Sequence, residues 1–90
     1  MTPTAAEALA MRALAYLAGK PEHLGRFLAA TGVGPAELRD RAADPNLLAA
    51  VLDHLLGDEP LLLAFCSSDG ADPGDPGRAR AQLPGFAEPM

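Results

Sequence analysis

Three side chains in this sequence could take part in nucleophilic or acid–base chemistry: Cys66, His23 and His54. Nucleophilic catalysis needs a nucleophile, a base and an orienting group that converge in one pocket. Cys66 lies in an apolar run, residues 61–66, where a thiol behaves as a small hydrophobic side chain. His54 falls at the edge of the apolar arc of its expected helix, and His23 falls in a first helical turn, where we expect it to be exposed. We therefore predict that the chain is not an enzyme, with catalysis by Cys66 and His54 as a minor alternative.

The histidines and acidic residues also lack the spacing of a metal site. A zinc centre uses four Cys or His ligands, or three and an open position, whereas this chain has one cysteine and two histidines 31 residues apart. Asp69, Asp72 and Asp75 offer oxygen ligands, but their segment lacks the alternating ligands and the distal glutamate of a calcium-binding EF-hand. Turn formation and helix capping explain these aspartates. We predict neither a metal nor a cofactor.

The segment Thr31–Pro35 is the sharpest local motif. Its glycines, Gly32 and Gly34, flank an apolar residue, and this arrangement is similar to the turn of helix-hairpin-helix DNA-binding domains, in which backbone N–H groups reach a phosphate. Nearby arginines could supply phosphate contacts: Arg26, Arg39 and Arg41. An ordinary turn between two helices explains the same glycines, with Gly32 ending one helix and Gly34-Pro35 beginning the next. Nucleic-acid binding at Gly32–Pro35 is therefore the alternative function, not the leading one.

The net charge and the cysteine content indicate which classes of partner and which cellular compartment to expect. The net charge is −5, and the acids are concentrated in the second half of the chain. Residues 1–43 hold five basic and four acidic side chains, whereas residues 44–90 hold two and eight. Phosphate backbones repel an acidic protein, so nucleic acid is an unlikely partner. One cysteine fits a reducing compartment, and we find neither a signal peptide nor an apolar run of bilayer length. We expect a cytoplasmic protein without a membrane partner.

The composition and the prolines predict an all-α fold. Alanine (19 residues) and leucine (15 residues) are strong helix formers, while isoleucine and tryptophan are absent and valine occurs twice. Proline suits the first turn of a helix, and six prolines are spaced as helix starts: Pro3, Pro21, Pro35, Pro45, Pro60 and Pro73. Helices are expected near residues 5–18, 21–31, 35–43, 45–56, 60–68 and 73–83, the first with a capping box of Thr4 and Glu7. We predict a small orthogonal bundle of five or six short helices without a sheet. Residues 1–83 form one domain, and residues 84–90 form a flexible tail.

The apolar helices suggest both a core and an interface. Residues 60–68 are apolar on nearly every side, so we expect that helix to be central. The helix over residues 45–56 has an apolar stripe too broad for one neighbour. Leu48, Leu52 and Leu56 on this stripe are therefore the candidate protein interface, for an unidentified protein partner or a homo-oligomer. Burial of all three within one chain would remove the argument.

Three segments of the chain, residues 7–18, 25–56 and 59–73, together resemble a family of small bacterial proteins of about 90 residues that is defined as a domain of unknown function. The most recognisable pieces are Glu7–Leu9, Arg12–Leu14, Gly25–Leu28 and Phe65-Cys66 followed by Gly70. The last helix departs from the family pattern, because Gly74, Pro76 and Gly77 replace better helix formers. The resemblance implies a small helical bundle in a bacterial cytoplasm, and it implies no activity.

Overall fold

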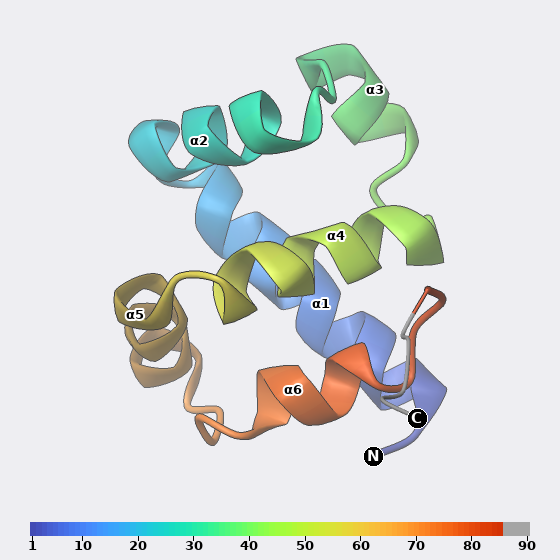
Figure 1. The fold of residues 1–90 in the computed structure, drawn as a ribbon, viewed down its shortest axis with the longest axis vertical. Coiled ribbons are helices and arrows are strands. Elements are labelled where there is room, and N and C mark those ends of the chain that lie inside the picture. Colours follow the sequence, from blue (N-terminus) through green and yellow to red (C-terminus); the bar gives the residue numbers. More distant parts are fainter. Residues whose placement is uncertain (86–90) are drawn as a thin grey trace.

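A computed structural model describes residues 1–85, and these residues form six α-helices and no strand (Figure 1). The helices are α1 (Pro3–Ala18), α2 (Pro21–Thr31), α3 (Pro35–Asp40), α4 (Pro45–Leu56), α5 (Glu59–Asp69) and α6 (Asp75–Arg80). The all-α prediction is confirmed, and the bounds expected for α2 and α4 are those observed.

Every helix has a proline at its first or second position, as the sequence indicated, but the last helix uses Pro76 instead of Pro73. Pro73 lies in a turn that precedes α6. Asp72 closes this turn, because its carboxylate accepts a hydrogen bond from the Gly74 N–H at 2.8 Å and its carbonyl accepts one from the Asp75 N–H at 2.9 Å. The last helix is therefore shorter than the expected span of residues 73–83.

Polar caps begin several helices, and two expectations about the helix ends are corrected. The α1 cap is Thr2 instead of Thr4, since the Thr2 Oγ1 atom accepts a hydrogen bond from the Ala5 N–H at 3.1 Å. Asp44 caps α4 as expected, accepting from the Asn46 N–H at 2.8 Å. Helix α3 ends at Asp40 instead of near residue 43, because the chain leaves the helix in a turn over residues 41–43.

The centre of the bundle is the crossing of α1 and α4, with α6 packed against both (Figure 1). Each of the two crossing helices contributes six buried residues. Helix α2 covers one side of the crossing, and α5 lies at the periphery, against α4 and α1. The prediction that α5 is central is therefore wrong. It buries one side, including Phe65 and Cys66, and leaves Leu63 45% exposed on the other.

One buried cation ties the last helix to the core. Arg80 is 8% exposed, and its Nε atom donates to Asp53 Oδ1 on α4 at 2.7 Å. The same guanidinium donates to the carbonyl oxygens of Leu83, at 3.4 Å, and Pro84, at 3.0 Å. These bonds hold the segment after α6 against the bundle, where Leu83 is buried. The predicted flexible tail, residues 84–90, begins at this contact, and its residues 86–90 lie outside the described part of the chain.

Candidate functional site

Cys66 is buried in the inward side of α5, as the sequence indicated. Its Sγ atom lies 3.8 Å from the carbonyl oxygen of Asp72. Burial raises the pKa of the thiol, and the nearby carboxylates of Asp75, Asp69 and Asp72 raise it further. Both causes disfavour the thiolate, which is the nucleophilic form of cysteine. This thiol is therefore a core side chain and a poor nucleophile.

The two histidines serve different elements. His54, in the last turn of α4, is half-buried as expected, and its ring meets the Phe27 ring edge to face, with centroids 5.5 Å apart and planes at 79°. It therefore belongs to the contact between α4 and α2. His23 is half-buried instead of exposed, because it lies where α1 and α2 meet. No group of three His, Cys, Asp or Glu side chains in residues 1–85 could hold a metal ion.

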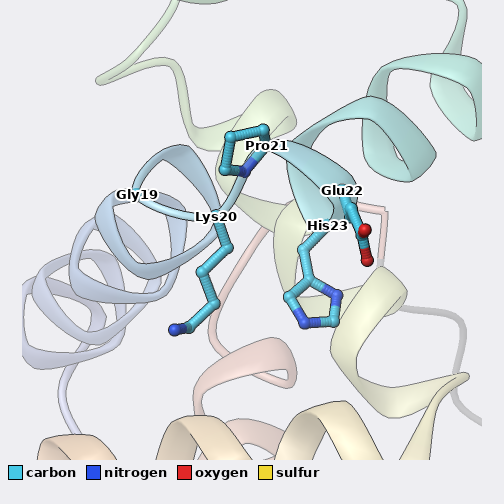
Figure 2. A pocket seen from close by; sticks show the side chains of 5 residues that line it. All are labelled: Gly19, Lys20, Pro21, Glu22 and His23. Carbon is cyan, nitrogen blue, oxygen red and sulfur yellow. The ribbon is translucent and has the colours of Figure 1, made fainter.

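His23 lines a shallow, open pocket at the connection between α1 and α2, which sequence reasoning missed (Figure 2). The other lining residues are Gly19, Lys20, Pro21 and Glu22. The Lys20 and His23 side chains extend on the same side of this connection (Figure 2). The Lys20 Nζ atom lies 5.1 Å from the centroid of the Tyr16 ring, within the range of a cation–π contact. The pocket is formed by five consecutive residues, and no distant element completes it.

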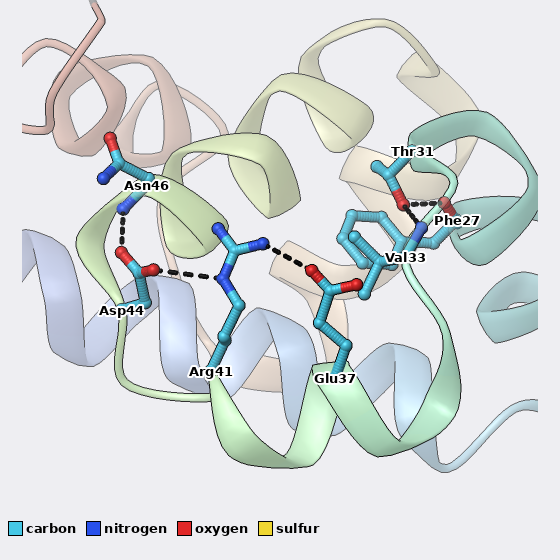
Figure 3. Close-up of polar contacts among 7 residues, drawn as sticks. All are labelled: Phe27, Thr31, Val33, Glu37, Arg41, Asp44 and Asn46. Atoms are coloured by element: carbon cyan, nitrogen blue, oxygen red, sulfur yellow. Dashed lines mark hydrogen bonds and ion pairs between the residues drawn. The ribbon is translucent and has the colours of Figure 1, made fainter.

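The glycine turn between α2 and α3 has its first two amides, those of Gly32 and Val33, hydrogen-bonded within the chain, and Figure 3 shows the bond of Val33. Gly32 ends α2 with a φ of 74°, and its N–H donates to the Leu28 carbonyl at 2.8 Å. The Val33 N–H donates to the Thr31 Oγ1 atom at 3.3 Å, and the Thr31 hydroxyl donates to the Phe27 carbonyl at 2.8 Å. The helix-hairpin-helix comparison needs these N–H groups to face a phosphate. Here they complete the end of α2.

The three arginines near this turn do not form a common cationic site. Arg41 donates to Glu37 Oε2 at 2.9 Å and to Asp44 Oδ2 at 3.1 Å (Figure 3). These hydrogen bonds raise the pKa of the Arg41 guanidinium. The pKa of Asp44 is lowered, chiefly by the backbone N–H of Asn46 and then by Arg41. Arg26 is exposed on α2, and Arg39 is exposed on α3. Gly34, the other glycine of the turn, precedes α3, which has six residues.

Of the three leucines predicted to form an interface, two are buried and one is exposed. Leu48 and Leu52 are both 0% exposed, so their assignment to an interface is wrong; α1 and α6 both pack against α4 and cover its broad stripe. Leu56 is 44% exposed at the end of α4. Leu63 on α5 is 45% exposed and was missed, because the apolar sequence around it predicted a central helix.

The outward side of α5 carries no charged side chain between its first residue, the exposed Glu59, and its last, Asp69. Its exposed residues at helical spacing, which we call the α5 face, are Pro60, Leu63, Ala64 and Ser67. No charged side chain occurs in residues 60–68. Leu56 is the last residue of α4, three residues before α5 begins. An exposed helix side normally carries charged residues, so its apolar character needs a reason.

Comparison with known proteins identifies the family. The family model described as "Protein of unknown function (DUF3572)" matches residues 3–86. The chain belongs to this family. The match spans all six helices and confirms the resemblance noted in the sequence. Neither the curated proteins nor the solved structures include a significant match to the chain. Within residues 1–85, no helix is both long and apolar enough to span a membrane.

Proposed function

We propose that this chain is a non-enzymatic protein-interaction module of the bacterial cytoplasm, and that it docks through the α5 face and Leu56. The observation that carries this proposal is the exposure of two large apolar side chains on consecutive helices, Leu56 at 44% at the end of α4 and Leu63 at 45% on α5. Contiguous exposed apolar patches mark interaction surfaces in soluble proteins, and a surface that joins these two leucines would be such a patch.

The energetics of the α5 face suit an anchor for a partner. Full burial of a leucine side chain contributes about 1.5–3 kcal/mol. Covering the exposed part of Leu56 and Leu63 would therefore contribute roughly 2 kcal/mol in total. Pro60, Ala64 and Ser67 present small surfaces, so a partner can approach the α5 backbone closely.

The non-enzymatic part of the proposal is supported by the state of Cys66. A catalytic thiolate must be reachable and must form near neutral pH. Cys66 is 3% exposed, and burial raises its pKa. The ring of His54, the other candidate catalytic residue, packs against the buried Phe27 ring. The free thiol is also consistent with a reducing cytoplasm.

A comparison of co-purified proteins tests the docking surface. Tagged wild-type chain and the L56S/L63S variant are expressed in the native bacterium, and the bound proteins are quantified with and without nuclease. The matched control is M11S, which removes an exposed apolar side chain from α1, 40% exposed in the structure. We expect a stoichiometric protein that survives nuclease, persists with M11S and is lost with L56S/L63S.

Two other outcomes would contradict this proposal. Material that disappears with nuclease would favour the nucleic-acid alternative at Gly32–Pro35, and a titration against duplex and single-stranded DNA at low salt would then show salt-sensitive binding. A partner retained equally by all three chains would place the interface elsewhere. Sedimentation equilibrium of the purified wild type distinguishes self-association from a separate partner, since self-association through the α5 face requires an L56S/L63S-sensitive dimer.

A further inference from the structure

The ion pairs within the chain show where the excess negative charge of its second half remains. Residues 44–85 contain seven acidic side chains. Five of them lie within 4 Å of an arginine: Asp44 with Arg41, Asp53 with Arg80, Asp69 with Arg12, and Asp72 and Asp75 with Arg78. Each of these carboxylates therefore has a cation nearby. The remaining two acids have no ion pair among the described residues.

These two acids are Asp58 and Glu59, which have no ion pair among the described residues and stand directly beside the proposed docking surface. They follow Leu56 by two and three residues. Glu59 is exposed and lies one helical turn before Leu63, so the two side chains are neighbours on α5. The Asp58 carboxylate accepts a hydrogen bond from the Leu61 N–H at 3.2 Å. The exposed leucines are thus bordered by carboxylates.

We propose that the partner of the α5 face is a cationic amphipathic segment, whose apolar side chains cover Leu56 and Leu63 and whose lysines or arginines face Asp58 and Glu59. This inference rests on the proposed function. An acidic partner would place like charges side by side at the edge of a desolvated contact, at a cost in affinity. A cationic partner would gain attraction at the same positions and faster association.

A second copy of this chain fits the face less well. In a parallel pairing of two α5 helices, Glu59 would meet Glu59 of the copy, and in an antiparallel pairing it would meet the end that carries Asp69. Asp69 already accepts a hydrogen bond from Arg12 at 2.9 Å, so that arginine is engaged. Neither pairing supplies an unengaged cation from α5 itself, which has no lysine or arginine. These charges therefore disfavour a symmetric pairing of two α5 helices, whereas a basic segment of a partner would supply the missing cations.

A pair of synthetic peptides tests the charge of the partner. Both are fluorescein-labelled 14-residue helices with leucine at identical positions, and the remaining positions are lysine in one and glutamate in the other. Fluorescence anisotropy measures their binding to the wild-type chain, E59Q and L63S at low and moderate salt. The control is E22Q, because Glu22 occupies the first turn of α2 as Glu59 occupies the first turn of α5. Circular dichroism confirms that every variant is folded.

We expect the lysine peptide alone to bind, with a Kd that rises at moderate salt. E59Q should raise the Kd by about threefold, as loss of one exposed charge pair would, and L63S by about tenfold or more, because it removes the apolar anchor. E22Q should leave the Kd unchanged.

The contrary results separate the two proposals. Equal binding of the glutamate peptide, still lost with L63S, would overturn the charge inference and leave the docking surface intact. Binding of the lysine peptide that E59Q and L63S do not alter would reflect general attraction to an acidic protein and would overturn the cationic partner of the α5 face. Failure of both peptides to bind would overturn the cationic partner, while the co-purification experiment would decide the docking surface independently.

Discussion

Replacing Phe27 with alanine should release α2 from the bundle while the other helices remain folded. Phe27 is the one residue of α2, Pro21–Thr31, that is buried, at 0% exposure. Its ring packs against His54 of α4, and the half-buried Leu24 and Leu28 add smaller contacts to the core. Helix α2 is thus held by a single anchor, whereas α1 and α4 each bury six residues.

The expected cost follows from this burial. Truncation of a buried phenylalanine to alanine costs about 3–5 kcal/mol. A chain of this length has a total stability of roughly 5–13 kcal/mol. The loss should be near the lower limit, about 3 kcal/mol, because α2 can separate from the core instead of holding an empty cavity. The folded variant would then expose more surface, so its denaturant m-value should fall as well.

Urea unfolding and native-state hydrogen exchange together test this reasoning. Amides of α2 should lose protection selectively in F27A, while those of α1 and α4 keep protection set by global unfolding. The control is L52A, which truncates a fully buried side chain of α4 at a cost of about 2–5 kcal/mol. L52A should lower protection in all helices together. A cost below about 1 kcal/mol for F27A, or α2 amides as protected as those of α4, would refute the single-anchor description.

Three further variants or reactions test other features. G32A should destabilise the chain by about 1–2 kcal/mol, because Gly32 has a φ of 74°. G34A should change stability by less than about 0.5 kcal/mol, because Gly34 has a φ of −84° and open space around it. Thermal unfolding compares the two variants, and equal effects would contradict the left-handed turn. Cys66 should resist iodoacetamide at pH 7.5 in the folded chain and react fully in 6 M guanidinium, as followed by mass spectrometry; rapid modification of the folded chain would show that the thiol is reachable. T2A should cost about 1 kcal/mol in urea unfolding by removing the α1 cap and T4A much less, and the reverse order would restore the Thr4 cap.

The starts of the helices could be predicted well from the sequence, because the signals are local. Pro21 and Pro45 begin the helices expected of them, and Asp44 caps α4 in the predicted way. The errors arose where two local signals competed. Thr2 and Thr4 both precede possible first turns, and Pro73 and Pro76 both could begin the last helix. Local chemistry permits either choice, and packing of the neighbouring segments decides between them.

The candidate site was predicted only in part, because exposure depends on packing between distant segments. Leu48, Leu52 and Leu56 lie on one broad stripe, and nothing in the spacing distinguishes the first two from the third. The structure covers Leu48 and Leu52 with neighbouring helices and leaves Leu56 at the end of α4. Leu63 was overlooked for the same reason, since an apolar run does not reveal which of its sides has a neighbour.

The sequence by itself determined that this chain is a bundle of short helices, where most of these helices begin, and that Cys66 is a core residue. Proline geometry, side-chain caps and helix propensity act within a few residues, so they can be read along the chain. The tertiary structure alone decided that α1 and α4 form the centre and that α5 lies outside. Burial is shared among segments far apart in sequence, and every apolar helix competes for the same limited interior. The side of α5 left without a neighbour is the surface on which the proposed function depends.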